Sequence, residues 1–243
     1  MSGDVYGNPL VFIPTYNEAG NIRELTARLG TLAPQPDILF IDDASPDGTG
    51  RILDELAAAN SAIRVIHRPC KKGVGSAHLE AIAFAYEKGY PLLVTMDADF
   101  THPPEAVPKL VEKAKGADLV VGSRFVDGGM FAEWRLWRKA LSLAGHWATT
   151  RLLGLPQDAT GAFRAYRLDR IPRRLFAPVR SAGYAFFFES LFVLWQSRVV
   201  IHELPVMARR RRHGRSKMGL SDMGASIGVM LRLLVRLRLS GRR

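Results

Sequence analysis

Short apolar runs alternate with helix-like segments through the first half of the chain, and this alternation constrains the fold more than any other feature. The apolar runs lie at 10–13, 38–41, 63–66, 92–96 and 119–121, with apolar residues at helical spacing between them. Runs of this length are typical of buried strands. Strands that alternate with helices favour an α/β fold, with a mostly parallel sheet flanked by helices on both faces.

Polar residues follow four of these runs, at the point where each predicted strand ends. In open α/β sheets, the ligand crevice lies outside the carboxyl ends of the strands. We therefore expect four strand ends to converge on one site, which would contain Tyr16, Asn17, Glu18, Asp42, Asp43, Asp97, Asp99, Ser123 and Arg124.

The tripeptide Asp97-Ala98-Asp99 directly follows the apolar run at 92–96. Past the last residue of a strand, side chains two positions apart can turn toward one point. Mg²⁺ commonly binds one or two carboxylates and completes its shell with water and substrate phosphates. On the tripeptide alone, a pair of solvated loop acids is an equally good interpretation.

Composition narrows the choice of partners. The 243 residues are 47% hydrophobic, enough for one large domain, and the single cysteine suits a reducing compartment. A formal net charge of +11 indicates anionic partners: nucleic acid, a membrane surface or a phosphorylated substrate. Zinc-ligand spacing and aromatic RNA-binding signatures are absent from the sequence, which argues against nucleic acid. The first residues do not resemble a signal peptide, so we predict a cytoplasmic protein.

Several spaced motifs resemble those of family-2 inverting glycosyltransferases, which have the GT-A (Rossmann-like) fold. Others resemble the dolichol-phosphate mannosyltransferase branch of that family. The resemblance implies a catalytic domain over 1–217 and a basic, amphipathic helical tail over 218–243. The family motifs are residues 14–18, 41–49 and 97–104, and the branch motifs are 122–124, 158–167 and 214–217.

The resemblance also implies roles for individual residues. Asp97, Asp99 and Thr101 would hold Mg²⁺ or Mn²⁺, which stabilises charge on the leaving nucleoside diphosphate. The catalytic residues would be Asp99, Arg124, Arg211 and Lys217. The nucleotide sugar would be held by Pro14, Tyr16, Glu18, Ile41, Asp43, Asp97, Ala98, Asp99, Arg124, Arg211 and Lys217.

The reaction implied by the resemblance is mannosyl transfer from GDP-mannose to polyprenyl or dolichyl phosphate, with a β-linked product. A phosphate monoester is largely a dianion at neutral pH, so this acceptor needs no general base. Donors that remain open are UDP-glucose and UDP-N-acetylhexosamine. More distant alternatives are a nucleotidyltransferase and a non-enzymatic basic protein that binds nucleic acid or membranes.

Two later segments indicate contact with an anionic membrane surface. Residues 130–155 combine tryptophan and leucine with arginine and lysine, and residues 223–239 are apolar but interrupted by three arginines. This composition is typical of helices that lie in the interface rather than cross it. We expect a peripheral position on the cytoplasmic face, with packing onto the catalytic domain as the alternative. A separate membrane-anchoring partner that presents the lipid is compatible with either.

Three charged residues remain outside these assignments. Glu189 interrupts an apolar segment, and a buried carboxylate is costly unless it is paired, so we predict a structural ion pair with an arginine. Asp158 also has apolar surroundings. Arg164 is a weaker candidate for anion binding. In the run 209–212, only Arg211 matches a family position, and a solvated charge run is an equally good interpretation of the others.

Overall fold

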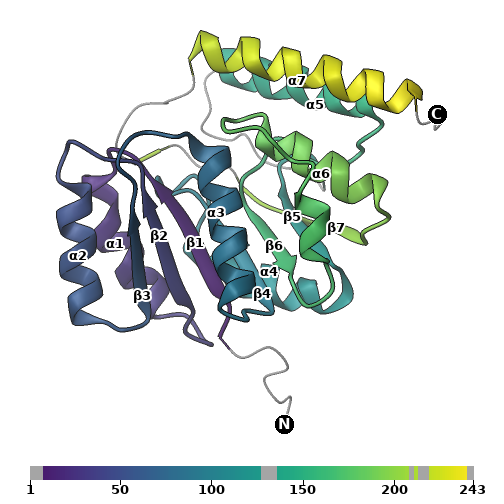
Figure 1. The fold of residues 1–243 in the computed structure, drawn as a ribbon. Coiled ribbons are helices and arrows are strands. Elements are labelled where there is room, and N and C mark those ends of the chain that lie inside the picture. Colours follow the sequence, from purple (N-terminus) through teal and green to yellow (C-terminus); the bar gives the residue numbers. More distant parts are fainter. Residues whose placement is uncertain (1–7, 127–135, 208–210, 213–218, 240–243) are drawn as a thin grey trace.

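The computed structural model describes residues 8–126, 136–207, 211–212 and 219–239, and its centre is one mixed sheet (Figure 1). Over these residues the sheet has seven strands in the order β3-β2-β1-β4-β6-β5-β7. β6 is antiparallel to both of its neighbours, and the other pairs are parallel. The strands are β1 (Leu10–Thr15), β2 (Asp37–Asp42), β3 (Ile63–His67), β4 (Leu92–Thr95), β5 (Leu119–Ser123), β6 (Arg164–Arg167) and β7 (Ile201–Pro205).

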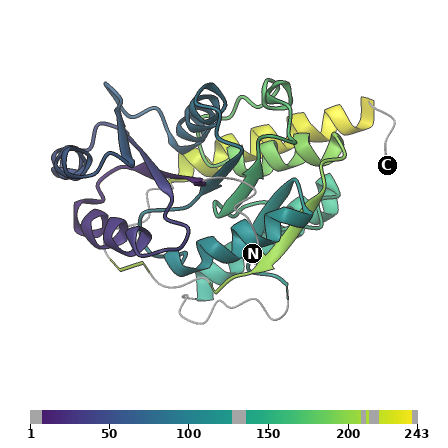
Figure 2. The same cartoon turned by 90° about the horizontal axis from the view of Figure 1, so that it is seen from below.

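Helices cover both faces of the sheet, as the sequence predicts (Figure 2). They are α1 (Ala19–Gly30), α2 (Thr49–Ala59), α3 (Val74–Glu87), α4 (Val107–Lys113), α5 (Leu136–Leu153), α6 (Phe186–Gln196) and α7 (Leu220–Leu239), with 3₁₀ turns η1 (Pro104–Ala106), η2 (Ala114–Gly116) and η3 (Arg173–Phe176).

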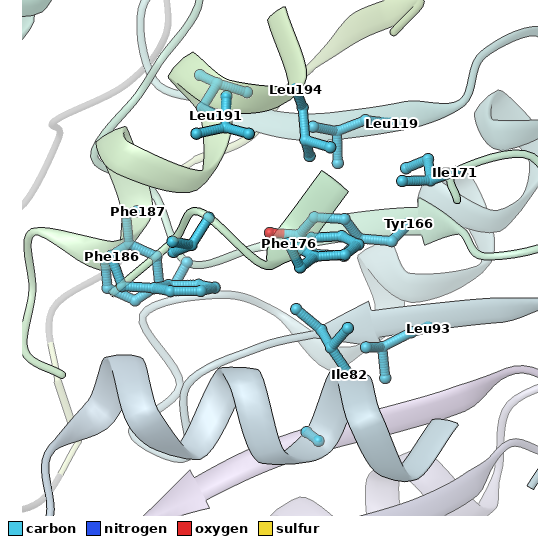
Figure 3. Close-up of a cluster of buried hydrophobic side chains, with 14 of the residues drawn as sticks. Ile82, Leu93, Leu119, Tyr166, Ile171, Phe176, Phe186, Phe187, Leu191 and Leu194 are labelled. Atoms are coloured by element: carbon cyan, nitrogen blue, oxygen red, sulfur yellow. The ribbon is translucent and has the colours of Figure 1, made fainter. Parts of the chain in front are cut away.

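Alternation along the strands divides the interior into two hydrophobic clusters. In β1, Leu10 and Phe12 pack with α3 and α6, whereas Val11 and Ile13 pack with α1, α2 and α4. This is the period of two that a pleated strand imposes. The first cluster brings together side chains of α3, α6 and the central strands (Figure 3). The sheet is therefore buried on both faces, which leaves the ends of its strands for ligand binding.

The antiparallel strand β6 is not predicted by the apolar pattern, because arginines occupy both of its ends. Arg164 is fully buried and donates to the carbonyl oxygens of Ala159 (3.0 Å), Gly161 (2.9 Å) and Phe187 (2.8 Å). These bonds tie the segment before β6 to α6. The suggestion that Arg164 binds anions is therefore wrong, because its guanidinium joins structural elements.

α5 and α7 lie side by side across one end of the molecule (Figure 1). α7 is seated on the body of the protein by Leu233, which is buried, and by Arg232, whose Nη2 lies 3.0 Å from Glu189 Oε1. The predicted ion pair of Glu189 is thus confirmed. The first residues of the predicted interfacial segment, 130–135, lie outside the described residues.

Candidate active site

A cavity of about 940 Å³ opens where the strand ends meet α5 and α7. Every described residue to which the resemblance gives a role lies on its wall, whereas Asn17, Asp42 and Ser123, also expected at the strand ends, do not line it. Lys217 falls outside the described residues, so its role stays a prediction. The predicted residues that line the cavity are Pro14, Tyr16, Glu18, Ile41, Asp43, Asp97, Ala98, Asp99, Thr101, Arg124 and Arg211.

Sharp turns directly after three parallel strands bring these side chains together. Asn17 after β1, Ala44 after β2 and Phe100 after β4 have left-handed φ angles of 55°, 57° and 63°. Residues other than glycine rarely adopt this backbone conformation, and such strained positions cluster at functional sites. Each turn redirects the chain at the carboxyl end of a strand, so the polar residues beside it face one space.

The carboxylate of Asp99 is buried and held in one orientation. Its Oδ1 accepts hydrogen bonds from the backbone N–H (2.9 Å) and the hydroxyl (2.6 Å) of Thr101. Its Oδ2 lies 2.9 Å from Arg211 Nε, an ion pair. Thr101 therefore orients Asp99, while Asp97 lines the same cavity. This end of the cavity combines two acids with a cation.

Asp43 organises the loop that leads into α3. Its carboxylate accepts from Arg68 Nη1 (2.9 Å) and from the backbone N–H groups of Lys72 (3.0 Å) and Gly73 (2.9 Å). In the same loop, Lys71 Nζ lies 4.3 Å from the centre of the Tyr16 ring. The two predicted nucleotide-binding residues are thus joined by one loop, and their contact with a nucleotide stays a prediction.

Arg124 is fixed to the cavity wall by a bidentate ion pair. Its Nε and Nη2 each lie 2.7 Å from an oxygen of Asp158, and Nη2 also donates to Thr160 Oγ1 at 2.5 Å. Burial alone would raise the pKa of Asp158, but the charge and hydrogen bonds of Arg124 outweigh it and lower that pKa. Asp158 therefore stays ionised and sets the orientation of Arg124.

Several cavity residues were not assigned to the site from the sequence, among them His102, Tyr184 and Asp222. Burial lowers the pKa of His102 to about 4, and its ring stacks on Phe163 with centroids 5.0 Å apart. Burial, followed by the charge of Asp97, raises the pKa of Tyr184 to about 12. His102 lies in the motif at 97–104 but was given no role there, and Tyr184 follows no predicted strand. Asp222 could have been singled out from the sequence, because it is the single acidic residue in the basic tail at 218–243.

The opposite end of the cavity is apolar. Its wall combines α5 and α7 with the aromatic start of α6, and the residues are Leu141, Leu152, Phe187, Phe188, Met223, Ile227, Met230, Leu231 and Leu234. Among the α5 residues on this wall, Ser142 has a buried hydroxyl with no hydrogen-bond partner among the described residues. The cavity thus runs from paired carboxylates to a hydrocarbon surface.

Comparison with known proteins identifies the family. Residues 10–192 match the model of glycosyl transferase family 2, which is most of the chain. The chain belongs to glycosyl transferase family 2. The strand-end motifs of this glycosyltransferase lie within the matched range, and the predicted enzyme class is confirmed.

Curated relatives of this glycosyltransferase carry names from one branch. An undecaprenyl-phosphate mannosyltransferase of Micrococcus luteus is 39% identical over 90% of each chain. A polyprenol monophosphomannose synthase of Mycolicibacterium smegmatis is 38% identical over 88% of this chain and 82% of the relative. The predicted resemblance to the dolichol-phosphate mannosyltransferase branch is therefore confirmed.

Solved structures confirm the fold. A glucosyl-3-phosphoglycerate synthase from Mycobacterium tuberculosis has a TM-score of 0.63 at 21% identity and covers 98% of this glycosyltransferase and 81% of its own chain. A mannosyltransferase from Pyrobaculum calidifontis, solved with GDP-Man and Mn²⁺, has a TM-score of 0.54 at 16% identity, with coverage of 96% and 64%. At these identities the likeness supports the GT-A fold.

Among the residues that the structure describes, no helix combines the length and the apolar character needed to cross a bilayer.

Proposed function

We propose that this glycosyltransferase transfers mannose from GDP-mannose to a polyprenyl or dolichyl phosphate with inversion, which yields a β-linked mannosyl phosphate lipid. The observation that carries the proposal is one cavity with carboxylates at one end and an apolar wall at the other. The end with the carboxylates would bind the nucleoside diphosphate sugar, and the end with the apolar wall would bind the prenyl chain. The names of the relatives from Micrococcus luteus and Mycolicibacterium smegmatis support the sugar and the lipid phosphate.

Asp97 and Asp99 would hold Mg²⁺ or Mn²⁺. Carboxylate oxygens suit these hard cations, which keep water and substrate phosphates as further ligands. Within the described ranges, no group of three or more acidic, histidine or cysteine side chains could hold a metal ion. A cation that shares its shell with a diphosphate fits such a pair. When bound, it supplies positive charge that stabilises the departing nucleoside diphosphate.

Arginine side chains would position the two anionic reactants. Arg124 is anchored by Asp158 and Thr160, so its guanidinium lies in a fixed place on the cavity wall. Arg211 lies against Asp99, the residue assigned to the diphosphate end. A preorganised cation stabilises developing charge without reorganisation during the reaction. We assign Arg124 and Arg211, with Lys217, to the phosphates of donor and acceptor.

The nucleotide would bind over Pro14, Tyr16, Glu18, Ile41 and Asp43. Tyr16 has an aromatic ring on which a base can stack, and Lys71 lies over that ring in this structure. A stacked base would therefore displace Lys71 from Tyr16. Since Asp43 binds the backbone of the same loop, the loop at 68–73 would adjust as the nucleotide enters.

The apolar face of α5 and α7 would lie on a membrane, which would present the lipid to the cavity. Along α7 an exposed apolar residue recurs every four positions, and Arg236 and Arg238 provide positive charge beside them. Amphipathic helices of this kind bind anionic lipid surfaces. The exposed apolar residues are Leu136, Leu141, Leu143, Trp147 and Leu152 on α5, and Met223, Ile227, Leu231, Val235 and Leu239 on α7. We place this contact on the cytoplasmic face.

A donor panel tests the proposal. The purified protein is assayed in mixed micelles with polyprenyl phosphate, Mg²⁺ or Mn²⁺, and GDP-mannose, UDP-glucose or UDP-N-acetylglucosamine. We expect the highest kcat/KM with GDP-mannose and a β-linked product by nuclear magnetic resonance. Preference for a UDP-sugar would refute the mannose assignment, and turnover of none would refute the enzymatic reaction.

A further inference from the structure

The first turn of α7 brings a carboxylate into the polar half of the cavity. Asp222 lines the cavity together with Gly183 and Tyr184. Its Oδ2 accepts a hydrogen bond from the backbone N–H of Gly219 at 2.8 Å, which caps the start of α7. Its Oδ1 lies 3.5 Å from the position that a Cβ would have on Gly183. The second oxygen therefore faces the segment that carries Tyr184.

That segment is held rigidly, which fixes Tyr184 relative to Asp222. The buried carboxylate of Glu189 accepts from the N–H groups of Arg180 (3.1 Å) and Ser181 (2.8 Å), and Ser76 N–H donates to the carbonyl of Ala182 at 3.1 Å. The segment also packs closely on α3, because a Cβ on Gly75 would lie 2.4 Å from the Ser181 carbonyl oxygen. Side chains on such supported backbone recognise ligands with defined geometry.

The chemistry of the pair suits hydroxyl groups and not phosphates. A carboxylate repels the phosphates of both reactants, whereas it accepts hydrogen bonds from neutral hydroxyl groups. The phenol of Tyr184 is protonated at neutral pH, so it can both donate and accept. In the proposed reaction, the group that is neutral and rich in hydroxyls is the hexose of the donor. The carboxylates assigned to the metal, Asp97 and Asp99, line the same part of the cavity.

We propose that Asp222 and Tyr184 bind hydroxyl groups of the hexose that is transferred, an inference that rests on the proposed function. It extends that function, because it gives α7 a part in sugar recognition as well as in membrane contact. Asp222 accepts from a sugar hydroxyl through Oδ1, and Tyr184, on the segment that Oδ1 faces, holds a neighbouring hydroxyl.

Calorimetry with two ligands tests the inference, since GDP lacks the hexose that GDP-mannose carries. The measured quantity is the ratio of the dissociation constants for GDP and GDP-mannose, each in Mg²⁺. Loss of a hydrogen bond to a charged group weakens binding by about tenfold. Asp222→Ala should therefore lower the ratio by about tenfold through GDP-mannose alone. Tyr184→Phe should also lower this ratio, but by a smaller factor.

Two further variants separate sugar binding from a structural role. Asp222→Asn keeps an oxygen that can cap Gly219 but loses the charge, so we expect a folded protein with an intermediate ratio. Asp54→Ala removes an exposed acid outside the cavity and should leave the ratio unchanged. A capping role alone would weaken both ligands together. An unchanged ratio in Asp222→Ala and Asp222→Asn would overturn the inference.

Analogues of GDP-mannose that lack single hydroxyl groups give a second readout. One analogue should bind to the wild-type protein and to Asp222→Ala with the same affinity, because the hydroxyl that Asp222 recognises is missing from it. If the wild-type protein bound every analogue more tightly than Asp222→Ala by the same factor, direct binding of a hydroxyl by Asp222 would be contradicted. The wild-type donor assay is run in parallel: turnover of GDP-mannose with an unchanged ratio refutes this inference alone, whereas no turnover refutes the proposed function.

Discussion

The two ends of the cavity are built in different ways. At the polar end, side chains project from turns that directly follow β1, β2 and β4, and buried bonds hold Asp43, Asp99 and Asp158 in place. At the apolar end, the wall comes from α5 and α7, whose outer faces are exposed. We infer from this difference that the polar end fixes the chemistry, whereas the apolar end would accommodate the long acceptor of the proposed reaction.

The largest effect is expected at the polar end, where Asp99→Asn should lower turnover by about a hundredfold or more. The substitution removes charge from the proposed metal site but keeps the volume and an oxygen that Thr101 can bond. Steady-state kinetics and circular dichroism check activity and fold, with Asp54→Asn as the exposed control. Turnover near that of wild type in a folded variant would contradict the metal assignment.

Removal of Glu189 should have the next largest effect, on stability. Glu189→Ala leaves two backbone N–H groups without their acceptor and should lower the free energy of unfolding by about 2–3 kcal/mol. Arg232→Ala breaks the same ion pair from its half-exposed side and should cost about 1 kcal/mol or less. Urea unfolding measures both. Equal losses would mean that the ion pair, and not the backbone bonds, holds this region.

At the apolar end, polar substitutions should weaken membrane binding and leave the chemistry intact. Trp147→Ser and Val235→Ser lie on exposed faces of α5 and α7 and outside the cavity wall, so each should lower the affinity for anionic vesicles by about tenfold. Sedimentation with vesicles of phosphatidylglycerol and phosphatidylcholine measures this. An exposed apolar residue away from these helices, changed in Val200→Ser, serves as the control. Unchanged vesicle binding in both variants would place the membrane contact elsewhere.

The smallest effect is expected from mild acid, through a histidine in the core. Burial lowers the pKa of His78 to about 3, so the unfolded chain binds a proton there near pH 6.5 and the folded chain does not. The unfolded state then binds more protons between about pH 3 and 6.5, and stability falls as pH falls through that window. The loss at pH 6 should stay below about 1 kcal/mol. His78→Gln should flatten the profile, and an unchanged slope would contradict this.

The polar end was largely predictable from the sequence, because apolar runs mark strands and the acids after them mark strand ends. Asp97 and Asp99 were found in this way. The partner that orients Arg124 was harder to predict, since Asp158 reaches it across 34 positions in the sequence. Tyr184 and Asp222 follow no strand. Whether they face the cavity depends on how the 180–184 segment packs on α3, which no local pattern encodes.

The apolar end was predicted in part. The composition of α5 and α7 indicated amphipathic helices, but one helical face looks the same in sequence whether it packs on protein or on lipid. The structure has a buried and an exposed apolar side in one helix, because Leu233 is buried while Leu231 and Val235 are exposed. The position of a helix on the folded protein decides which of its apolar residues are buried. The boundary between the catalytic domain and the tail at residue 217 stays a prediction.

The central claim is that one cavity holds the donor at its polar end and the prenyl chain at its apolar end. The most direct test compares kcat/KM for a long-chain polyprenyl phosphate with that for a short, water-soluble prenyl phosphate in wild type and Met230→Gln. Met230 lines the apolar end, so we predict a selective loss of about tenfold with the long acceptor and an unchanged KM for GDP-mannose. Equal losses with both acceptors would contradict the claim.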